Sequence, residues 1–147
     1  MKKGRTEGGT LISQVHPISQ RVWYDVLSRN GLEDLAGARG RVIFALWNED
    51  NIPIKNLVEK TSLDKATLTG IIDRLERDGY VKRIQSPDDK RVTLISRTGK
   101  DEIFKTKIPE VSDQQNAIFY KGFSTREIEE FENYLKRILE NCRQAEK

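Results

Sequence analysis

The sequence IKNLVEKTSLDKATLTGIIDRLERDGYV, residues 54–81, decides the fold. Its apolar residues recur at helical spacing in two runs, over residues 54–61 and 64–78, which Thr61-Ser62-Leu63-Asp64 joins. Asp64 can accept hydrogen bonds from the free amides of the second helix's first turn. Gly79 suits the left-handed position that follows its last turn. Two short helices joined this tightly predict a helix-turn-helix.

A basic β-hairpin is expected directly after this unit. Residues 80–85 and 91–96 form two short β segments, and Ser86-Pro87-Asp88-Asp89 between them has strong turn chemistry. Lys90 and Arg91 lie beside the turn, where long cations can reach phosphates or the minor groove. A helix-turn-helix followed by such a hairpin predicts DNA binding, with the second helix in the major groove. Ile52-Pro53-Ile54, ahead of the first helix, is too short to form an independent strand.

Longer helical segments lie on both sides of this core. On the amino side, the apolar residues from Leu11 to Val26 have helical spacing, and the helix stops at Asn30-Gly31. Pro17 either opens this helix at its first turn or kinks it. A further helix is expected over residues 37–48.

On the carboxyl side, two sequences have capping-box spacing and each should open a helix: Thr98-Gly99-Lys100-Asp101 and Ser124-Thr125-Arg126-Glu127. Pro109 should bend or divide the first of these helices. The apolar residues of the last helix form a narrow seam: Ile128, Phe131, Leu135, Ile138 and Cys142. Only another helix can bury such a seam, and the first helix also buries too little within one chain. We therefore expect a homodimer.

Composition narrows the class of protein. A chain of 147 residues, 36% of them hydrophobic, suits one compact domain or two small interlocked ones. The net charge is only +3, but cations gather between Lys82 and Lys100, whereas the segment after Glu127 leans acidic. This distribution predicts a local surface for a polyanion such as double-stranded DNA.

The sequence excludes several classes of protein. No run approaches the roughly 20 apolar residues of a membrane span, and the basic start lacks the apolar run of a signal peptide, so we expect a cytoplasmic protein with no membrane partner. One cysteine and one histidine cannot form an intrachain disulfide or an ordinary metal cage. Without a glycine-rich phosphate loop, paired histidines or a Ser/His/Asp set, the chain should be no enzyme and should need no cofactor.

The sequence resembles the winged helix-turn-helix of the MarR (multiple antibiotic resistance) family of transcriptional regulators. The residues that carry the resemblance are 54–81, Asp88-Asp89-Lys90-Arg91 and 92–100. Asp89 and Arg91 match the Asp-x-Arg signature of that family's wing. The resemblance is tight from about Leu35 to Lys105 and architectural outside this range. The combination of recognition helix, Gly79 and wing is more specific than any one part.

The resemblance implies a mainly α fold with a small β-wing, in which a winged helix-turn-helix is flanked by amino- and carboxyl-terminal dimerisation helices. The winged domain would span residues 37–97, the dimerisation region residues 10–36 and 98–147, and a flexible basic arm residues 1–9. It further implies a homodimeric regulator, a repressor, bound to a pseudo-palindromic operator and released by a small aromatic or anionic effector.

The family's DNA-binding positions fall on residues of the second helix and the hairpin. Arg91 would enter the minor groove, and Asp89 would orient the wing by pairing with a neighbouring arginine. Arg74 and Arg83 match positions that meet the DNA backbone, and Thr69 lies at a base-facing position. Gly70 departs from the family, which often has arginine there, so Arg74 or Lys65 would take over its role or base readout would be weaker. The full candidate set is Lys65, Thr67, Thr69, Gly70, Arg74, Arg83, Asp89, Lys90 and Arg91.

The other candidates concern an effector. His16 and Tyr24, on the first helix, could line an effector pocket, although an exposed helix histidine without a ligand is the simpler interpretation. Cys142 could form a redox link across a dimer, or be an ordinary seam residue. Two alternatives to a regulator stay open: a winged-helix module that binds a protein partner, and a small-molecule binding protein without specific DNA binding.

Overall fold

The computed structural model describes Gly4 and residues 6–147. Its elements follow one another along the chain in this order: α1 (Gly8–Arg29), a 3-10 turn η1 (Glu33–Leu35), α2 (Gly37–Asn48), β1 (Ile52–Pro53), α3 (Ile54–Thr61), α4 (Lys65–Arg77), β2 (Val81–Gln85), β3 (Thr93–Arg97), α5 (Glu102–Phe119) and α6 (Thr125–Ala145). The predicted fold class, mainly helical with a small β-wing, is confirmed. Of the expected basic arm, residues 1–3 and 5 lie outside the described residues, and α1 begins at Gly8.

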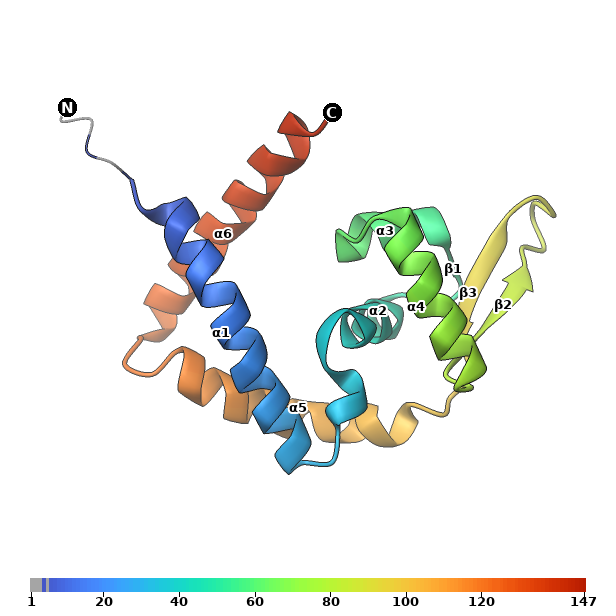
Figure 1. Cartoon of the computed structure of the whole chain (residues 1–147), viewed down its shortest axis with the longest axis horizontal. Coiled ribbons are helices and arrows are strands. Elements are labelled where there is room, and N and C mark those ends of the chain that lie inside the picture. The colour runs from blue at the N-terminus through green and yellow to red at the C-terminus, as the bar shows by residue number, and fades with distance from the viewer. Residues whose placement is uncertain (1–3, 5) are drawn as a thin grey trace.

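The elements form two groups in space (Figure 1). Helices α2, α3 and α4 lie together with the strands, whereas α1 and α6 lie on the other side. Helix α5 runs from the end of β3 towards α1, and it contacts α1. The winged helix-turn-helix is therefore joined to the flanking helices through α5 and through the turn between α1 and α2.

The wing is part of a three-stranded antiparallel sheet with the strand order β1-β3-β2. The third strand corrects the expectation for Ile52-Pro53-Ile54: Ile52 pairs with Ile95, and Pro53 with Leu94. The segment is too short to be a strand alone, but β3 supplies a partner already held by β2. This pairing fixes the start of α3 against the base of the hairpin.

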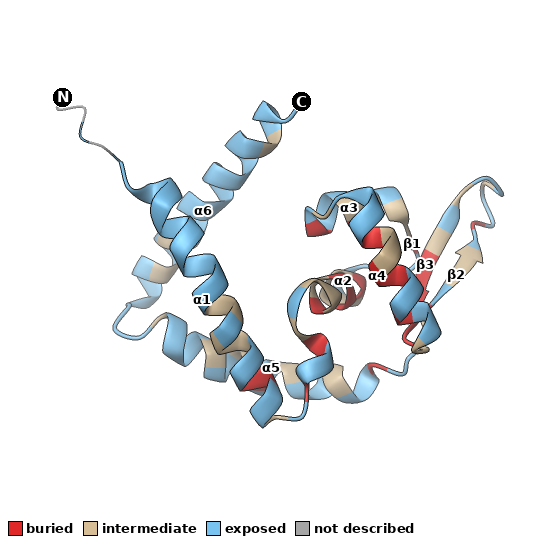
Figure 2. Ribbon diagram, in the orientation of Figure 1, coloured by how far each residue is buried: buried red, intermediate tan, exposed pale blue. Residues whose placement is uncertain are grey.

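The hydrophobic core lies in the winged half of the molecule. Figure 2 shows buried residues concentrated in and around α2–α4 and the base of the hairpin. Apolar side chains of the helix-turn-helix that are wholly covered include Leu57, Leu68, Ile72 and Leu75. Helix α6 contains no buried residue. The predicted seam residues Leu135 and Ile138 remain exposed in the single chain, and so does Cys142.

The local signals for α4 and α6 are confirmed. The Asp64 carboxylate accepts from the Thr67 amide at 2.8 Å, and Gly79 has a φ of +83° after the helix end. Ser124 and Glu127 form the predicted capping box at the start of α6. These caps satisfy amides that the helix itself cannot bond.

The expected capping box at Thr98 is wrong. Helix α5 begins at Glu102, and the Thr98 hydroxyl donates instead to the Gly79 carbonyl oxygen at 2.6 Å. The Asp101 side chain accepts hydrogen bonds from Arg97, four residues earlier, and from Trp47 in α2. Pro17 lies inside α1 and Pro109 inside α5, so Pro17 does not open its helix and Pro109 does not divide α5.

One close contact between backbones had no signal in the sequence. The turn η1 brings the Leu35 carbonyl oxygen against buried Gly40 in α2. A Cβ atom at Gly40 would lie 1.8 Å from that oxygen, so only glycine fits there.

Candidate nucleic-acid interface

The amino-terminal half of α4 presents small and polar residues. Lys65 and Thr67 are exposed, and Thr69 and Gly70 are partly buried. The Thr67 hydroxyl donates to Asp64 at 2.7 Å, and the Thr69 hydroxyl donates to the Lys65 carbonyl oxygen at 2.8 Å. Hydrogen bonds from the Thr67 amide and hydroxyl lower the pKa of Asp64 below its ordinary value. The first turn is therefore fixed before any ligand binds.

Gly70 is not required by the fold. A Cβ atom there would meet no described atom within 4 Å. Glycine in the middle of a helix costs about 1 kcal/mol relative to alanine. The structure thus leaves an open position on α4 where many members of the family carry arginine.

The tip of the wing is held by its own hydrogen bonds. Arg91 donates through Nη2 to Asp89 Oδ2 at 3.0 Å and through Nε to Asp89 Oδ1 at 3.1 Å. These contacts lower the pKa of the Asp89 carboxyl, and the Arg91 side chain is still 90% exposed. The side-chain amide of Gln85 donates to the Lys90 carbonyl oxygen at 2.8 Å across the turn. The cations at the tip are therefore exposed to solvent on a hairpin whose turn is hydrogen-bonded.

Arg83, in β2, is bound to α4. Its guanidinium donates to Asp73 Oδ1 at 2.6 Å and to Glu76 Oε1 at 2.8 Å, and its backbone amide donates to Glu76 Oε2 at 3.1 Å. Burial would lower the pKa of Arg83, but the hydrogen bonds to Asp73 and Glu76 more than offset it and raise the pKa. The first strand of the wing is thus tied to the recognition helix.

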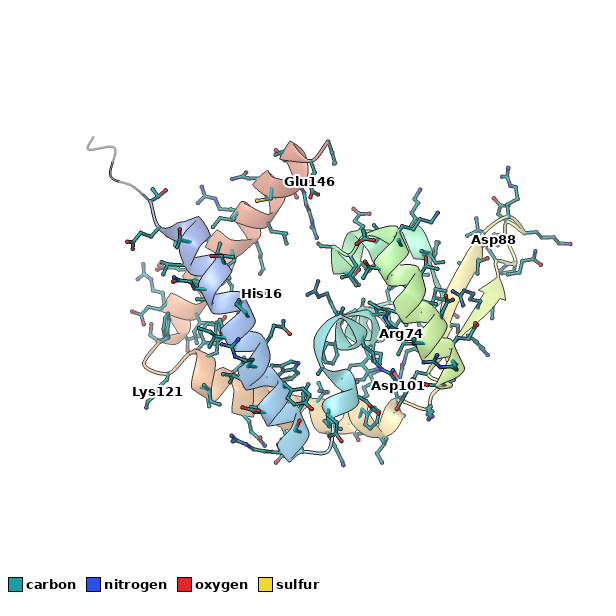
Figure 3. All side chains as sticks on the ribbon, in the orientation of Figure 1. His16, Arg74, Asp88, Asp101, Lys121 and Glu146 are labelled. Atoms are coloured by element: carbon teal, nitrogen blue, oxygen red, sulfur yellow. The ribbon has the colours of Figure 1, made fainter. Side chains whose placement is uncertain are left out.

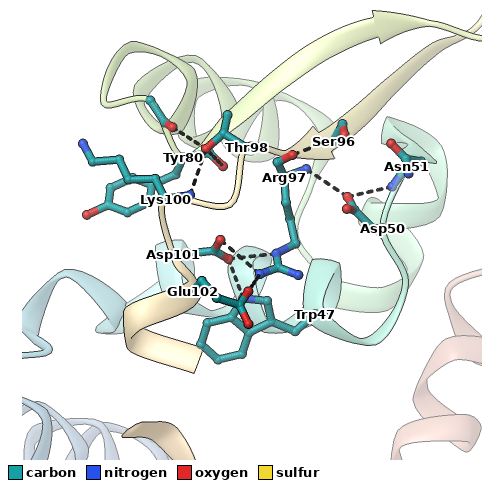
Figure 4. A network of polar contacts seen from close by, with 11 residues as sticks. Trp47, Asp50, Asn51, Tyr80, Ser96, Arg97, Thr98, Lys100, Asp101 and Glu102 are labelled. Atoms are coloured by element: carbon teal, nitrogen blue, oxygen red, sulfur yellow. Dashed lines mark hydrogen bonds and ion pairs between the residues drawn. The ribbon is translucent and has the colours of Figure 1, made fainter. Parts of the chain in front are cut away.

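A buried ion pair joins the wing to α5 (Figure 4). Arg97, at the end of β3, donates to both carboxylate oxygens of Asp101 at 2.9 and 3.1 Å, and to Glu102 at 2.9 Å. Asp101 is 2% exposed and also accepts a hydrogen bond from the Trp47 indole of α2. Asp50 accepts from the Arg97 backbone amide at 2.9 Å. Three elements therefore meet at one carboxylate.

All the predicted DNA-binding residues lie on α4 or on the adjoining hairpin. Figure 3 labels Arg74 on α4 and Asp88 in the turn of the wing. Arg74 is exposed, as are Lys90 and Arg91. The cations of the hairpin are less available than the sequence indicates, since carboxylates of α4 and α5 bind Arg83 and Arg97. Asp73 and Glu76 lie on α4, outside the hairpin, so the charge pattern of the hairpin does not reveal them, whereas Asp101 follows Arg97 by only four residues.

The two effector candidates lie elsewhere. His16 and Tyr24 are exposed on α1, apart from α4. An apolar pocket of about 510 Å³ lies between α1, α5 and α6, and neither residue lines it. Its aromatic walls are Phe119, Tyr120, Phe123 and Phe131. The sequence analysis missed these residues, although the spacing of aromatic residues at the end of α5 was visible.

The described part of the chain has neither a metal-binding cluster nor a membrane-spanning helix. No group of three or more His, Cys, Asp or Glu residues there could hold a metal ion. None of its helices is long and apolar enough to cross a membrane.

A helix-turn-helix with a fixed basic hairpin defines a winged-helix DNA-binding protein. The MarR family model matches residues 38–93. The transcriptional regulator SarZ of Staphylococcus haemolyticus is 34% identical over 108 residues, which cover 74% of this chain and 72% of that protein. The chain belongs to the MarR family and is a DNA-binding transcriptional regulator, not an enzyme.

Solved structures show the same fold over nearly the whole chain. A variant of MarR from E. coli in complex with operator DNA matches with a TM-score of 0.77 and 28% identity, covering 89% of this chain and 92% of that one. The transcriptional regulator SlyA matches with a TM-score of 0.79 and 20% identity, covering 95% and 96%. The flanking helices α1, α5 and α6 are thus part of the shared architecture.

Proposed function

We propose that the chain is a repressor that binds a pseudo-palindromic operator as a homodimer, with α4 in the major groove and the wing in the minor groove. The observation that supports this most is the rigid basic tip beside an exposed recognition helix. Arg91 is 90% exposed and is directed away from the hairpin by its pair with Asp89, so a narrow groove can reach it.

The proposal gives each candidate residue a role. Lys65, Arg74 and Lys90 contact phosphates, which supply affinity and register. Thr67, Thr69 and Gly70 lie on the face of α4 that approaches the bases. Asp89 holds Arg91 in place. The guanidinium of Arg83 is already bound to Asp73 and Glu76 of α4, so Arg83 is given no DNA contact here.

The uncovered face of α1, α5 and α6 supports a dimer. The chain exposes 10618 Å², whereas a compact monomer of 17.0 kDa exposes about 7,700 Å². The exposed large apolar residues lie mainly on these three helices: Leu11, Ile12, Val15 and Ile18 on α1, Ile118 and Phe119 on α5, and Tyr134, Leu135, Ile138 and Leu139 on α6. A second copy covering this face would bury an area typical of an obligate dimer.

The apolar pocket between α1, α5 and α6 is the proposed place for a small aromatic effector. Because it opens on the face assigned to the second copy, a bound effector would be enclosed between the two chains. Protein-observed NMR titration with aromatic carboxylates should shift the signals of Phe119 and Phe131. Shifts confined to α1 around His16 and Tyr24 would favour the original candidates instead.

Replacing Arg91 with alanine is expected to weaken operator binding by roughly 10- to 100-fold without loss of fold. The substitution removes the side chain that the proposal places in the minor groove while leaving the hairpin intact. Fluorescence anisotropy with labelled operator measures the effect. Arg126→Ala is the matched control, since Arg126 is also an exposed arginine paired with a carboxylate, but on α6. Equal affinity of the Arg91 variant and the control would refute the wing assignment.

Replacing Ile138 with glutamate is expected to convert the dimer to a monomer at micromolar concentration, because a charge would be buried in the seam. Light scattering reports the mass. Asn133→Glu adds the same charge on the opposite side of α6 and should leave the dimer intact. A wild-type monomer, or two variants with equal mass, would contradict the proposed interface.

Titration of the protein against DNA from upstream of its own gene and a scrambled duplex, at two salt concentrations, tests the function as a whole. Tight binding that prefers the native duplex and falls steeply with salt is expected, since phosphate contacts release counterions. Equal weak binding to both duplexes would favour a protein-interaction module or a regulator whose operator lies elsewhere.

A further inference from the structure

Arg83 and two carboxylates of α4 form a cluster that DNA binding as described above does not use. We call Arg83, Asp73 and Glu76 the Arg83 clamp. Asp73 and Glu76 lie one turn apart on α4, and Arg83 bridges both from β2 with contacts of 2.6 and 2.8 Å. The Arg83 amide adds a third hydrogen bond to Glu76. Charge-assisted contacts of this kind are among the stronger hydrogen bonds in proteins.

The clamp limits what Arg83 can do at a DNA surface. Its side chain is 27% exposed, whereas those of Asp73 and Glu76 are 61% and 41% exposed. The Nη1 and Nη2 atoms of Arg83 already donate to Glu76 and Asp73, and its remaining N–H donors lie on a side chain that is less exposed than either carboxylate. A phosphate that approached these donors would also approach two carboxylates, whose repulsion opposes a direct contact.

The position of the clamp favours a different role. Strand β2 leads directly into the turn that carries Lys90 and Arg91, and Arg83 pairs with Ile95 of β3 within the sheet. The clamp therefore joins the base of the wing to the second half of the recognition helix. Major and minor grooves lie at a fixed separation on the duplex, so the spacing between α4 and the wing tip decides whether both can engage.

We propose that Arg83 is a positioning residue, which through Asp73 and Glu76 sets the wing relative to α4 and does not itself bind phosphate. The proposal rests on the proposed function for its effect on DNA, but the clamp itself can be measured in the free protein. It replaces the family-based expectation that Arg83 meets the DNA backbone.

The decisive variant is Asp73→Asn with Glu76→Gln, which removes both negative charges of the clamp, weakens its hydrogen bonds and keeps Arg83. Removing two negative charges should strengthen binding to the scrambled duplex. If the clamp positions the wing, the preference for the native duplex over the scrambled one nevertheless falls about tenfold. If Arg83 is a phosphate contact, the same variant frees it and affinity for the native duplex rises with undiminished preference. That result would overturn the proposal.

Arg83→Gln gives the second comparison. Loss of the clamp should lower affinity for the native duplex about tenfold while the slope of log K against log[salt] stays as in the wild type. Lys90→Gln, at a proposed phosphate contact, is the control and should reduce that slope by about 0.9. A comparable reduction in Arg83→Gln, or no loss of affinity, would contradict the proposal.

Hydrogen exchange in the absence of DNA separates the clamp from the proposed function. The Arg83 amide donates to Glu76 Oε2, so its exchange rate reports the clamp directly. Both clamp variants should accelerate exchange at the backbone amide of residue 83 and through the wing, while thermal unfolding shows that they remain folded. Unchanged exchange would overturn the clamp itself. If exchange accelerates in the variants but the wild-type protein does not prefer the native duplex, the clamp is supported and the operator-binding function is rejected.

Discussion

Replacing Asp101 with alanine is expected to destabilise the protein by about 3–5 kcal/mol, which is the range observed when one partner of a buried ion pair is removed. Asp101 is 2% exposed and Arg97 14% exposed, so the guanidinium would lose its main partner in a place that water reaches poorly. The Trp47 indole N–H would also lose its acceptor. Chemical denaturation measures the change in the free energy of unfolding.

The same carboxylate should make stability depend on pH. Burial alone would raise the pKa of Asp101, but hydrogen bonds from Arg97 and Trp47 outweigh burial and lower the pKa below its ordinary value of 3.8. A carboxyl whose pKa is lower in the folded state stabilises the fold above its unfolded pKa, and this contribution is lost as the pH falls through the folded pKa. Asp101→Asn should therefore lose less stability than the wild type on acidification below about pH 4.

Asp89→Ala is the control for the Asp101 variant. Asp89 also pairs with an arginine, but at the exposed tip of the wing, where ion pairs contribute little to stability. Its removal should leave the unfolding transition almost unchanged. If both aspartate variants unfolded at the same denaturant concentration, the junction between β3, α2 and α5 would not depend on the buried pair.

Replacing Gly40 with alanine is expected to cost at least about 3 kcal/mol of stability. The added Cβ atom would lie 1.8 Å from the Leu35 carbonyl oxygen and 2.7 Å from its carbonyl carbon, and both belong to backbone. A rotamer change cannot relieve this contact, so η1 and the start of α2 must separate. The wholly buried Leu35 would then lose part of its packing.

Gly70→Ala is the matched control for Gly40→Ala. It is the same substitution within a helix, but the added methyl group would meet no described atom within 4 Å. The variant should gain about 1 kcal/mol of stability from higher helix propensity. Thermal unfolding of the two variants should therefore move in opposite directions. A loss of stability in both would show that the contact with Leu35 is not what makes Gly40 necessary.

The helix-turn-helix and the hairpin could be predicted because their signals are local. Asp64 accepts a hydrogen bond from Thr67, three residues further along the chain, and Gly79 ends α4 by adopting a positive φ. Ser86-Pro87-Asp88-Asp89 forms the turn of the hairpin within one segment. Such contacts depend on residues that are adjacent in the sequence, so composition and spacing reveal them. The resemblance to the MarR family added the roles of Arg91 and Asp89.

The features that could not be predicted depend on distant partners. Thr98 has the spacing of a helix cap, but its hydroxyl donates to the carbonyl oxygen of Gly79, and Trp47 of α2 binds Asp101 together with the neighbouring Arg97. Ile52 becomes a strand residue only because Ile95 lies beside it. In each case tertiary contact outweighed a local preference.

The uncovered face of α1, α5 and α6 also means that the stability of the protein should depend on its concentration. If each chain covers this face with a second copy, unfolding releases two molecules, and every tenfold dilution removes about 1.4 kcal/mol from the stability of the pair. The melting temperature should then rise with protein concentration. Cell growth dilutes the chain continuously, so its rate of synthesis would help set the fraction that is folded, paired and able to occupy DNA.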